Sequence, residues 1–277
     1  SLGYLAETMD IPSMLISHGT HVLHPDGATV LEHELLAKNL LFGGYRYLGI
    51  QTSLSYDYAL KKQIPNRSIV KITPTILLNN QSKSKNKHKL TVLHASTIKD
   101  GTKRFLYETP DELLETFQET IEILSTCKNI KLIIKFRQIK AFSFKSLKTL
   151  LGTLPDNVSL VSDGPFGDFL ASSHLLMSFS STTIEEALIN DTPVLLYGGK
   201  GRYSHIPTEP LKLGETEDIL TTVTFVDSRE SLAEYFTVLD KNYAKFIDHQ
   251  FDFSRYRLKD SMRVIDWLEQ NNIFNEV

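Results

Sequence analysis

The chain has 277 residues, of which 41% are hydrophobic and 23% are charged, and its formal net charge is −3. This composition is typical of a soluble globular protein, and the negative balance does not favour general binding to nucleic acid. Cys127 is the single cysteine, which excludes an internal disulfide and a cysteine-based zinc cage.

The N-terminal stretch SLGYLAETMD begins without a methionine, and Leu5, Ala6 and Met9 follow the pattern of a helix already under way. We expect that the start of a longer protein is missing, with a processed methionine or a tag remnant as the alternative. No apolar run approaches the roughly 18 residues that cross a bilayer, and no signal peptide is visible. We therefore expect a cytoplasmic protein.

The first 89 residues alternate irregularly between strand and helix patterns. We expect strands at 11–17, 47–51 and 68–78, and helices at 30–41 and from about Ser53, which would cap its own helix. The basic stretch QSKSKNKHK at 81–89 contains no apolar residue. We interpret it as an exposed loop or interdomain linker, and a patch for anionic ligands is the alternative.

From residue 90 onward, strands and helices alternate regularly. The expected strands are 90–96, 130–136, 158–162, 174–180, 193–198 and 222–228. The expected helices are 110–127, 143–154, 167–173, 182–191, 229–243 and 251–270. Because the strands are apolar on both faces, we expect an α/β fold with a Rossmann-like, doubly wound parallel sheet covered on both sides.

The turn Ser180-Ser181-Thr182-Thr183 ends a buried strand and starts a helix. Ligands of a doubly wound sheet bind at the carboxyl ends of its strands, and free N–H groups at a helix start favour an anion such as phosphate. A carboxylate one turn later, Glu186, would accept hydrogen bonds from ribose hydroxyls. The alternative is a capping box, which Thr182 and Glu185 fit by their spacing. The spacing alone does not decide between the two interpretations.

The segment DFLASSHLLMSFSSTTIEEALINDTPVLLY at 168–197 resembles the nucleotide-binding stretch of GT-B type glycosyltransferases. It is similar to capsule and teichoic-acid polymerases of the CDP-glycerol glycerophosphotransferase type. It is also similar to UDP-N-acetylglucosamine 2-epimerase. The Ser-rich turn and Glu-Glu-Ala of that epimerase match Ser178, Ser180, Glu185, Glu186 and Ala187. The epimerase has Gly-Gly where this chain has Ser181-Thr182.

The resemblance covers roughly residues 11–270 and implies two Rossmann-like domains. In this reading, 1–68 is the C-terminal part of an acceptor-side α/β domain and 69–245 is the nucleotide-sugar-binding domain. Residues 246–277 would be C-terminal crossover helices, with Ile265 and Trp267 packed on the N-terminal domain.

The resemblance also implies which residues meet the donor. The expected nucleotide-binding residues are Ser96, Thr97, Arg137, Ser180, Ser181, Thr182, Thr183 and Glu186. In the related proteins the loop after the first strand of this domain faces the donor phosphates, so Lys99, Lys103 and Arg104 would add positive charge there. An ordinary solvated loop is the alternative. The related enzymes often carry a basic residue at this strand end, so Arg137 would pair bidentately with phosphate. In some relatives His-Pro or Pro follows that residue, whereas this chain has Gln138.

The stretch PSMLISHGTHVLHPDG at 12–27 carries the expected base. In the teichoic-acid type polymerases, a His-Gly after a strand faces the interdomain cleft. A histidine titrates near neutral pH and can take a proton from an acceptor hydroxyl. His18 is therefore the expected catalytic residue, with Gly19 and His21 binding substrate. The alternatives are a structural loop histidine and a metal site, although Gly and Pro between the histidines argue against one helical face.

The loop GGKGRYSHIPTEP at 198–210 would close over the base or the sugar, as in GT-B relatives, with Arg202 and His205 joining Lys103 and Arg104 as substrate-binding residues. A mobile glycine loop is the alternative. The chain has no Walker loop GxxxxGK[ST], no GxGxxG, no GxSxG elbow and no Asp-x-Asp pair.

The implied function is metal-independent transfer of a sugar, or of a polyol phosphate, from a nucleotide donor. The acceptor would be a cell-surface polysaccharide such as capsule or lipopolysaccharide, or a lipid-linked glycan. No cofactor and no nucleic-acid partner are implied, and peripheral association with the inner face of the membrane is compatible with this reading. One alternative is a nucleotide-sugar epimerase-like enzyme. The other is a non-catalytic nucleotide-binding remnant of the same fold.

Overall fold

The computed structural model describes residues 2–17, 22–23, 30–31, 34–35, 41, 43–63, 68–75, 88–96, 108–140, 142–198, 205–212 and 219–271. The chain forms two compact units. The small unit consists of residues 1–78 and 254–277, and the large unit of residues 79–253. None of the helices within the described ranges is long and apolar enough to cross a membrane.

The large unit is built on six parallel strands in the order β6-β5-β4-β7-β8-β9. The strands are β4 (Leu90–Ser96), β5 (Ile130–Phe136), β6 (Val158–Val161), β7 (Leu175–Ser178), β8 (Val194–Leu196) and β9 (Val223–Phe225). This is the doubly wound order, in which β5 and β6 are added on one side of β4 and β7, β8 and β9 on the other. The expected Rossmann-like sheet is confirmed, and each of its six strands lies within the predicted range.

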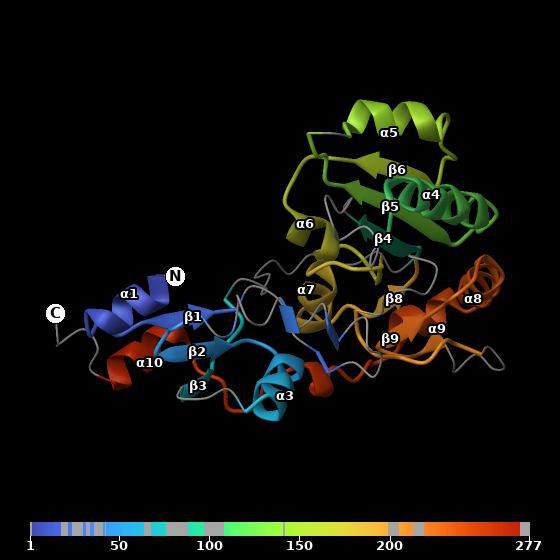
Figure 1. Cartoon of the computed structure of the whole chain (residues 1–277). Coiled ribbons are helices and arrows are strands. Elements are labelled where there is room, and N and C mark those ends of the chain that lie inside the picture. Colours follow the sequence, from blue (N-terminus) through green and yellow to red (C-terminus); the bar gives the residue numbers. More distant parts are fainter. Residues whose placement is uncertain are drawn as a thin grey trace. The chain divides into compact units, whose positions relative to one another are not determined.

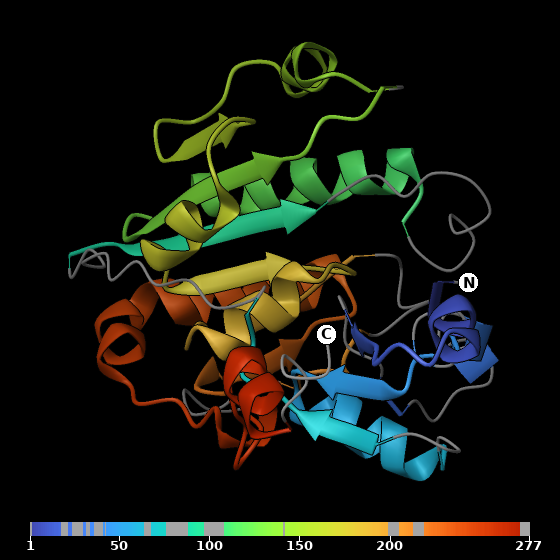
Figure 2. The same ribbon diagram turned by 90° about the vertical axis from the view of Figure 1, so that its left-hand side faces the viewer.

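Helices cover both faces of this sheet. They are α4 (Pro110–Ser125), α5 (Phe144–Leu151), α6 (Phe166–Ala171), α7 (Thr183–Ile189), α8 (Arg229–Lys241) and α9 (Tyr243–Asp248). Figure 1 shows α4 and α8 on one side of the strands and α6 and α7 on the other, and Figure 2 shows the same arrangement with α6 and α7 in front. This two-sided covering explains why β4 is buried along its whole length.

The core of the large unit lies between the sheet and the α4–α8 side. Val92 and Leu132 come from the strands, Phe117 from α4, and Leu232 and Phe236 from α8. All five are at most 1% exposed. Full burial of such a side chain contributes about 1.5–3 kcal/mol to the hydrophobic term, so this layer fixes the positions of the strand ends.

Local sequence signals define the starts of the helices on this side. At α4, Thr109 and Glu112 form a capping box and Pro110 stands in the first turn. At α8, the Ser228 side chain accepts a hydrogen bond from the backbone N–H of Ser231. At α7, the alternative interpretation of the turn as a capping box is wrong, because Thr182 has helical φ and ψ and makes no side-chain cap.

The small unit contains a three-stranded parallel sheet in the order β1-β2-β3. Its elements are α1 (Leu2–Thr8), β1 (Met14–Ile16), β2 (Tyr47–Ile50), α3 (Ser53–Lys61), β3 (Ser68–Lys71), the 3-10 helix η4 (Ser254–Tyr256) and α10 (Val264–Gln270). On the side of the small sheet that α3 covers, Leu48, Ile50 and Tyr58 are buried together. On the opposite side, Val70, Ile72 and Trp267 are buried together.

The boundary between the units falls after residue 78 rather than 68, because β3 pairs with β2 and not with the large sheet. The chain returns to the small unit at residue 254. The single helix expected at 251–270 is wrong. Asp260 has a positive φ of 58°, and Met262 then runs beside β3, where its N–H donates to the carbonyl of Lys71 at 3.2 Å.

Two smaller expectations for the small unit also need correction. The cap of α3 is Thr52, whose side chain accepts from the backbone of Ser55, while the hydroxyl of Ser53 donates to the carbonyl of Arg255. Trp267 is buried as expected, but Ile265 is 43% exposed. Most of the helix expected at 30–41 and most of the stretch 81–89 lie outside the described residues.

Candidate functional site

A pocket of about 360 Å³ lies at the carboxyl ends of four neighbouring strands in the large unit. We call it the switch-point pocket. It is lined by Ala95, Ser96, Lys135, Arg137, Gln138, Ser162, Gly164, Phe166, Ser181, Thr182 and Thr183. These residues lie at or just beyond the ends of β4, β5, β6 and β7, which are adjacent in the sheet. The point where the strand order reverses, between β4 and β7, is therefore part of the pocket.

Two cations from β5 and its end face this pocket. The ammonium group of Lys135 donates to the carbonyl of Ser162 and, at 3.0 Å, to that of Asp163. Burial lowers the pKa of Lys135, while the charge of Asp163 opposes this change. Arg137 is exposed and makes no ion pair within the described ranges. Lys135 is thus held in place, and Arg137 is available to an anion.

Two hydroxyl groups at the pocket are buried without a protein partner. The Oγ of Ser96 and the Oγ1 of Thr183 have no hydrogen-bond partner in the part of the chain that the structure describes. Ser96 as a residue is only 7% exposed. A buried hydroxyl that makes no hydrogen bond costs about 1–3 kcal/mol, so such groups call for a partner such as a ligand or water.

The Ser-Thr turn supplies the remaining polar wall. The backbone N–H of Thr183 donates to the Oγ of Ser181 at 3.4 Å, and Thr182 is exposed. Together with the two cations, this wall offers positive charge and hydroxyl donors on several sides. A phosphate or carboxylate group fits that combination, because charge-assisted hydrogen bonds are roughly twice as strong as neutral ones.

Two of the expected nucleotide-binding residues lie beside the turn but do not line the pocket. Ser180 is 8% exposed, and Glu186 is partly buried on α7. Burial raises the pKa of Glu186 to about 7. This carboxyl group is therefore about half protonated near neutral pH, and it can donate as well as accept a hydrogen bond.

Glu185 and His205 form a buried pair that was not predicted. The Nε2 of His205 lies 2.8 Å from Oε1 of Glu185, and the two residues are 8% and 3% exposed. The pair joins α7 to the segment after β8. His205 was expected to bind substrate, but this nitrogen is already engaged. The adjacent glutamates Glu185 and Glu186 do not by themselves indicate that the first carboxylate contacts a histidine 20 residues later.

The other expected site residues lie outside the described residues. They are His18, Gly19, His21, Thr97, Lys103, Arg104 and Arg202. The expected base and most of the expected substrate-binding residues are among them. Within the described ranges, no group of three His, Cys, Asp or Glu side chains is placed to hold a metal ion.

Lys135 and the segment after β6 line the pocket but were not among the predicted site residues. Ser162, Gly164 and Phe166 line the pocket because β6 ends beside β5. The only sequence signal was their position directly after a predicted strand, at the edge where ligands bind. Gly164 has a φ of +84°, so the chain turns sharply there.

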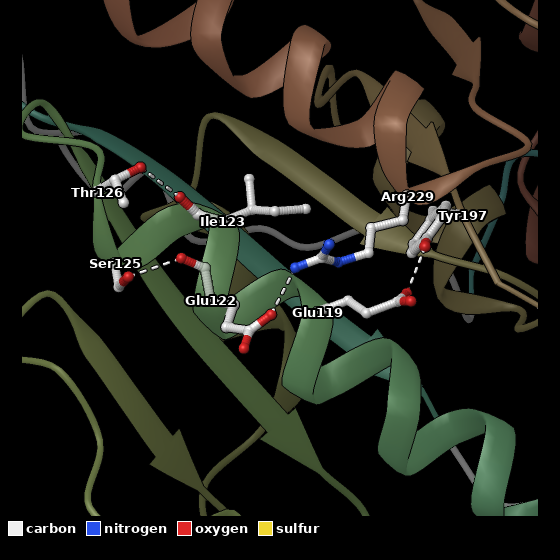
Figure 3. Close-up of polar contacts among 7 residues, drawn as sticks. All are labelled: Glu119, Glu122, Ile123, Ser125, Thr126, Tyr197 and Arg229. Atoms are coloured by element: carbon white, nitrogen blue, oxygen red, sulfur yellow. Dashed lines mark hydrogen bonds and ion pairs between the residues drawn. The ribbon is translucent and has the colours of Figure 1, made fainter.

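A second pocket of about 240 Å³ lies between α4, α8 and the end of β8. Its lining contains the carboxylates of Glu112, Glu115, Glu119 and Asp227. Figure 3 shows that Glu119 accepts from the hydroxyl of Tyr197, at 2.5 Å, and that Arg229 is turned to Glu122, at 2.6 Å. Burial and this carboxylate raise the pKa of Tyr197. These carboxylates disfavour a phosphate here, so of the two pockets the switch-point pocket has the lining that suits an anion better.

Comparison with known proteins gives a fold but not a family. No family model matches the sequence, and no curated protein matches it. Among solved structures, the UDP-GlcNAc 2-epimerase from Neisseria meningitidis bound to UDP-GlcNAc is similar, with a TM-score of 0.56 and 14% identity. The similarity covers 93% of this chain and 68% of that one.

Two further structures are similar over nearly the whole chain. The UDP-GlcNAc 2-epimerase from Methanocaldococcus jannaschii, in complex with UDP-GlcNAc and UDP, has a TM-score of 0.56 and 13% identity. CalG4, the calicheamicin glycosyltransferase, has a TM-score of 0.55 and 13% identity. Each similarity covers 99% of this chain and 72% of the other. The chain therefore has the GT-B fold, which confirms the resemblance stated from the sequence at the level of the fold.

Proposed function

We propose that this protein is a glycosyltransferase that takes its sugar, or polyol phosphate, from a nucleotide donor bound in the switch-point pocket. The observation that carries the proposal is the chemistry of this pocket. Lys135 and Arg137 line the same pocket as the hydroxyls of Ser96 and Thr183, which are buried and have no hydrogen-bond partner among the described residues. The pocket lies at the ligand-binding edge of the sheet. The GT-B fold supports it, because the similar structures include a glycosyltransferase and two complexes with UDP-GlcNAc.

In the proposed reaction, the bond between the sugar and the nucleotide breaks and the nucleotide leaves with increased negative charge. Arg137 and the tethered Lys135 would stabilise that charge, together with the hydroxyl donors of the turn. Lys135 is already held in place by the carbonyls of Ser162 and Asp163, so it needs no reorganisation when charge develops. We therefore propose that no metal ion is needed, and chelation with EDTA should leave turnover unchanged.

His18 is the proposed base that takes the proton from the acceptor hydroxyl, with Gly19 and His21 beside the acceptor. The proposed acceptor is a cell-surface polysaccharide or a lipid-linked glycan. His18→Ala should lower turnover by roughly 100-fold or more while nucleotide affinity stays the same, because general-base catalysis contributes about 10²–10⁴-fold. Equal turnover of this variant and the wild type would remove His18 from the mechanism.

Titration calorimetry with UDP, CDP, CMP and GDP tests the donor site directly and identifies the base. Ser96→Ala and Thr183→Val each remove a hydroxyl that makes no hydrogen bond among the described residues, so no such bond is lost within the protein. Both variants should unfold at or above the wild-type temperature, because each loses a buried hydroxyl that makes no hydrogen bond. Both should bind the preferred nucleotide more weakly. Unchanged affinity in both variants would count against the pocket as the phosphate site.

An epimerase-like reaction is the second candidate, because two of the similar structures are UDP-GlcNAc 2-epimerases. It would use the same nucleotide site but no external acceptor. The two reactions are separated by incubating the protein with UDP-GlcNAc alone. Inverted stereochemistry in the recovered sugar nucleotide supports the epimerase, whereas acceptor-dependent release of UDP supports the transferase.

A further inference from the structure

A pocket of about 440 Å³ lies on the small unit and has no role in the proposed donor site. We call it the aromatic pocket. It is lined by Tyr47, Tyr56, Ile69, Val70, Lys71, Asp260, Met262, Trp267 and Asn271. These residues come from β2, α3, β3 and the segment 260–271, so the pocket follows the β3 edge of the small sheet. Its volume is within the range of about 300–1,000 Å³ that is typical of small-molecule sites.

Aromatic rings form much of its wall, and their contacts hold them in position. Tyr47 and Trp267 meet edge to face, with centroids 4.6 Å apart and an interplanar angle of 69°. The ammonium of Lys71 lies 4.6 Å from the centroid of the Tyr56 ring. Tyr47 and Tyr56 remain partly exposed. The wall is therefore a fixed apolar surface that a ligand can reach.

The polar groups of the pocket are few and balanced in charge. Lys71 is the cation, Asp260 is the carboxylate, and Asn271 adds an amide whose nitrogen donates to the carbonyl of Trp267 at 2.8 Å. Asp260 holds a φ of 58°, a left-handed conformation that aspartate adopts more readily than most non-glycine residues. An anionic ligand would meet Asp260, and a cationic ligand would meet Lys71, so the pocket favours a neutral ligand.

We propose that the aromatic pocket binds a neutral sugar unit of an oligosaccharide. A pyranose ring has an apolar face of C–H groups, whose partial positive charge suits the negative face of an aromatic ring. Its hydroxyls need donors and acceptors at the rim, which Lys71, Asp260 and Asn271 supply. The switch-point pocket has the opposite character, with two cations and no carboxylate among its lining residues.

This sugar site goes beyond the proposed donor site and does not depend on it. The aromatic pocket is made of small-unit residues, and the switch-point pocket is made of large-unit residues. A sugar titration without nucleotide therefore gives a result whether or not the chain binds a nucleotide.

Trp267 makes the test direct, because it is the only tryptophan in the chain. Its emission is followed while maltotriose, cellotriose and chitotriose are each added without nucleotide. At least one of the three should change the emission saturably in the millimolar range, and the same sugar should show saturation transfer by NMR. No saturable change and no transfer with any of the three would overturn the proposal, as would a response to UMP but to none of the sugars.

Two variants and a matched control locate the binding. Tyr56→Ala removes one wall. Asp260→Gly removes the carboxylate but keeps a residue that accepts the positive φ. Each should weaken sugar binding roughly tenfold or more, measured by saturation transfer and by Trp267 emission. Tyr4→Ala removes a tyrosine of the same unit that is 57% exposed and lies outside the pocket, and it should bind as the wild type does. Wild-type affinity in both pocket variants would contradict the assignment.

Discussion

His94 provides the sharpest prediction about the stability of the large unit. It lies in the middle of β4, opposite Ile134 of β5 and Met177 of β7, and it is fully buried. Its ring meets Phe117 edge to face at 4.8 Å, and neither ring nitrogen has a hydrogen-bond partner within the described residues. Burial lowers the pKa of His94 from 6.5 to about 3. The folded protein therefore requires the neutral ring.

The size of the effect follows from these two pKa values. Below pH 6.5 the unfolded chain binds a proton at this histidine, whereas the folded chain does not bind it until about pH 3. Stability is therefore lost as the pH falls through this window. Linkage gives a loss of about 2 kcal/mol between pH 8 and pH 5, approaching ~5 kcal/mol below pH 3.

His94→Leu removes this contribution and also removes two buried nitrogens without partners. Between pH 8 and pH 5, the free energy of unfolding of the variant should fall by about 2 kcal/mol less than that of the wild type. At pH 8 the variant should be at least as stable. Urea unfolding followed by circular dichroism measures both, while the emission of Trp267 reports the small unit separately.

His249→Leu is the matched control for this comparison. His249 also meets a phenylalanine edge to face, Phe251 at 4.6 Å, but it is partly exposed. The free energy of unfolding of His249→Leu should change with pH as that of the wild type does. If the free energy of unfolding of His94→Leu changes with pH as that of the wild type does, burial does not lower the pKa of His94 in this way.

Three further predictions concern Gly198, His205 and Cys127. Gly198→Ala should lower the free energy of unfolding in urea by more than about 2 kcal/mol, because φ is +133° and the new Cβ would collide with the carboxylate of Glu108. Gly152→Ala, with φ +66° and nothing within 4 Å, should cost only about 1 kcal/mol, and equal costs would contradict the clash. His205→Ala should destabilise by about 3 kcal/mol, because it leaves Glu185 buried without this partner. Its nucleotide affinity should stay near wild type, and the reverse result would restore His205 as a ligand. Burial raises the pKa of the Cys127 thiol to about 11, so alkylation at pH 8 should be roughly 100-fold slower than for a free thiol and normal in urea. Fast alkylation of the native protein would show that burial does not raise the pKa of this thiol.

The large unit could be predicted because its signals are local. The run Leu90–Ser96 is apolar on both faces, so it reads as a central parallel strand without any knowledge of its neighbours. Ser143 and Ser228, which cap α5 and α8, are also local signals, because each serine directly precedes its helix in the sequence. The Ser-Thr turn at 180–183 could be placed at the carboxyl edge of the sheet, because it follows such a strand directly.

The side-chain partners could not be predicted, because they depend on distant segments. Glu185 stands at the spacing of a capping box, but its carboxylate instead lies within hydrogen-bond distance of His205, 20 residues later. Ile265 and Trp267 are both apolar, and only the direction of α10 against the small sheet decides that one is exposed and the other buried. The aromatic pocket combines residues more than 200 positions apart, so no sequence window contains it.

We propose above all that the switch-point pocket binds the nucleotide donor through its phosphates. The most direct measurement is the calorimetric affinity of Arg137→Gln for whichever of UDP, CDP, CMP and GDP the wild type binds most tightly. The control is Lys131→Gln, which removes an exposed cation near the other end of the same strand, β5. We predict that Arg137→Gln weakens binding by roughly tenfold or more, the loss of a hydrogen bond to a charged group, while the control binds as the wild type does. Equal affinities of Arg137→Gln, Lys131→Gln and the wild type would contradict the account.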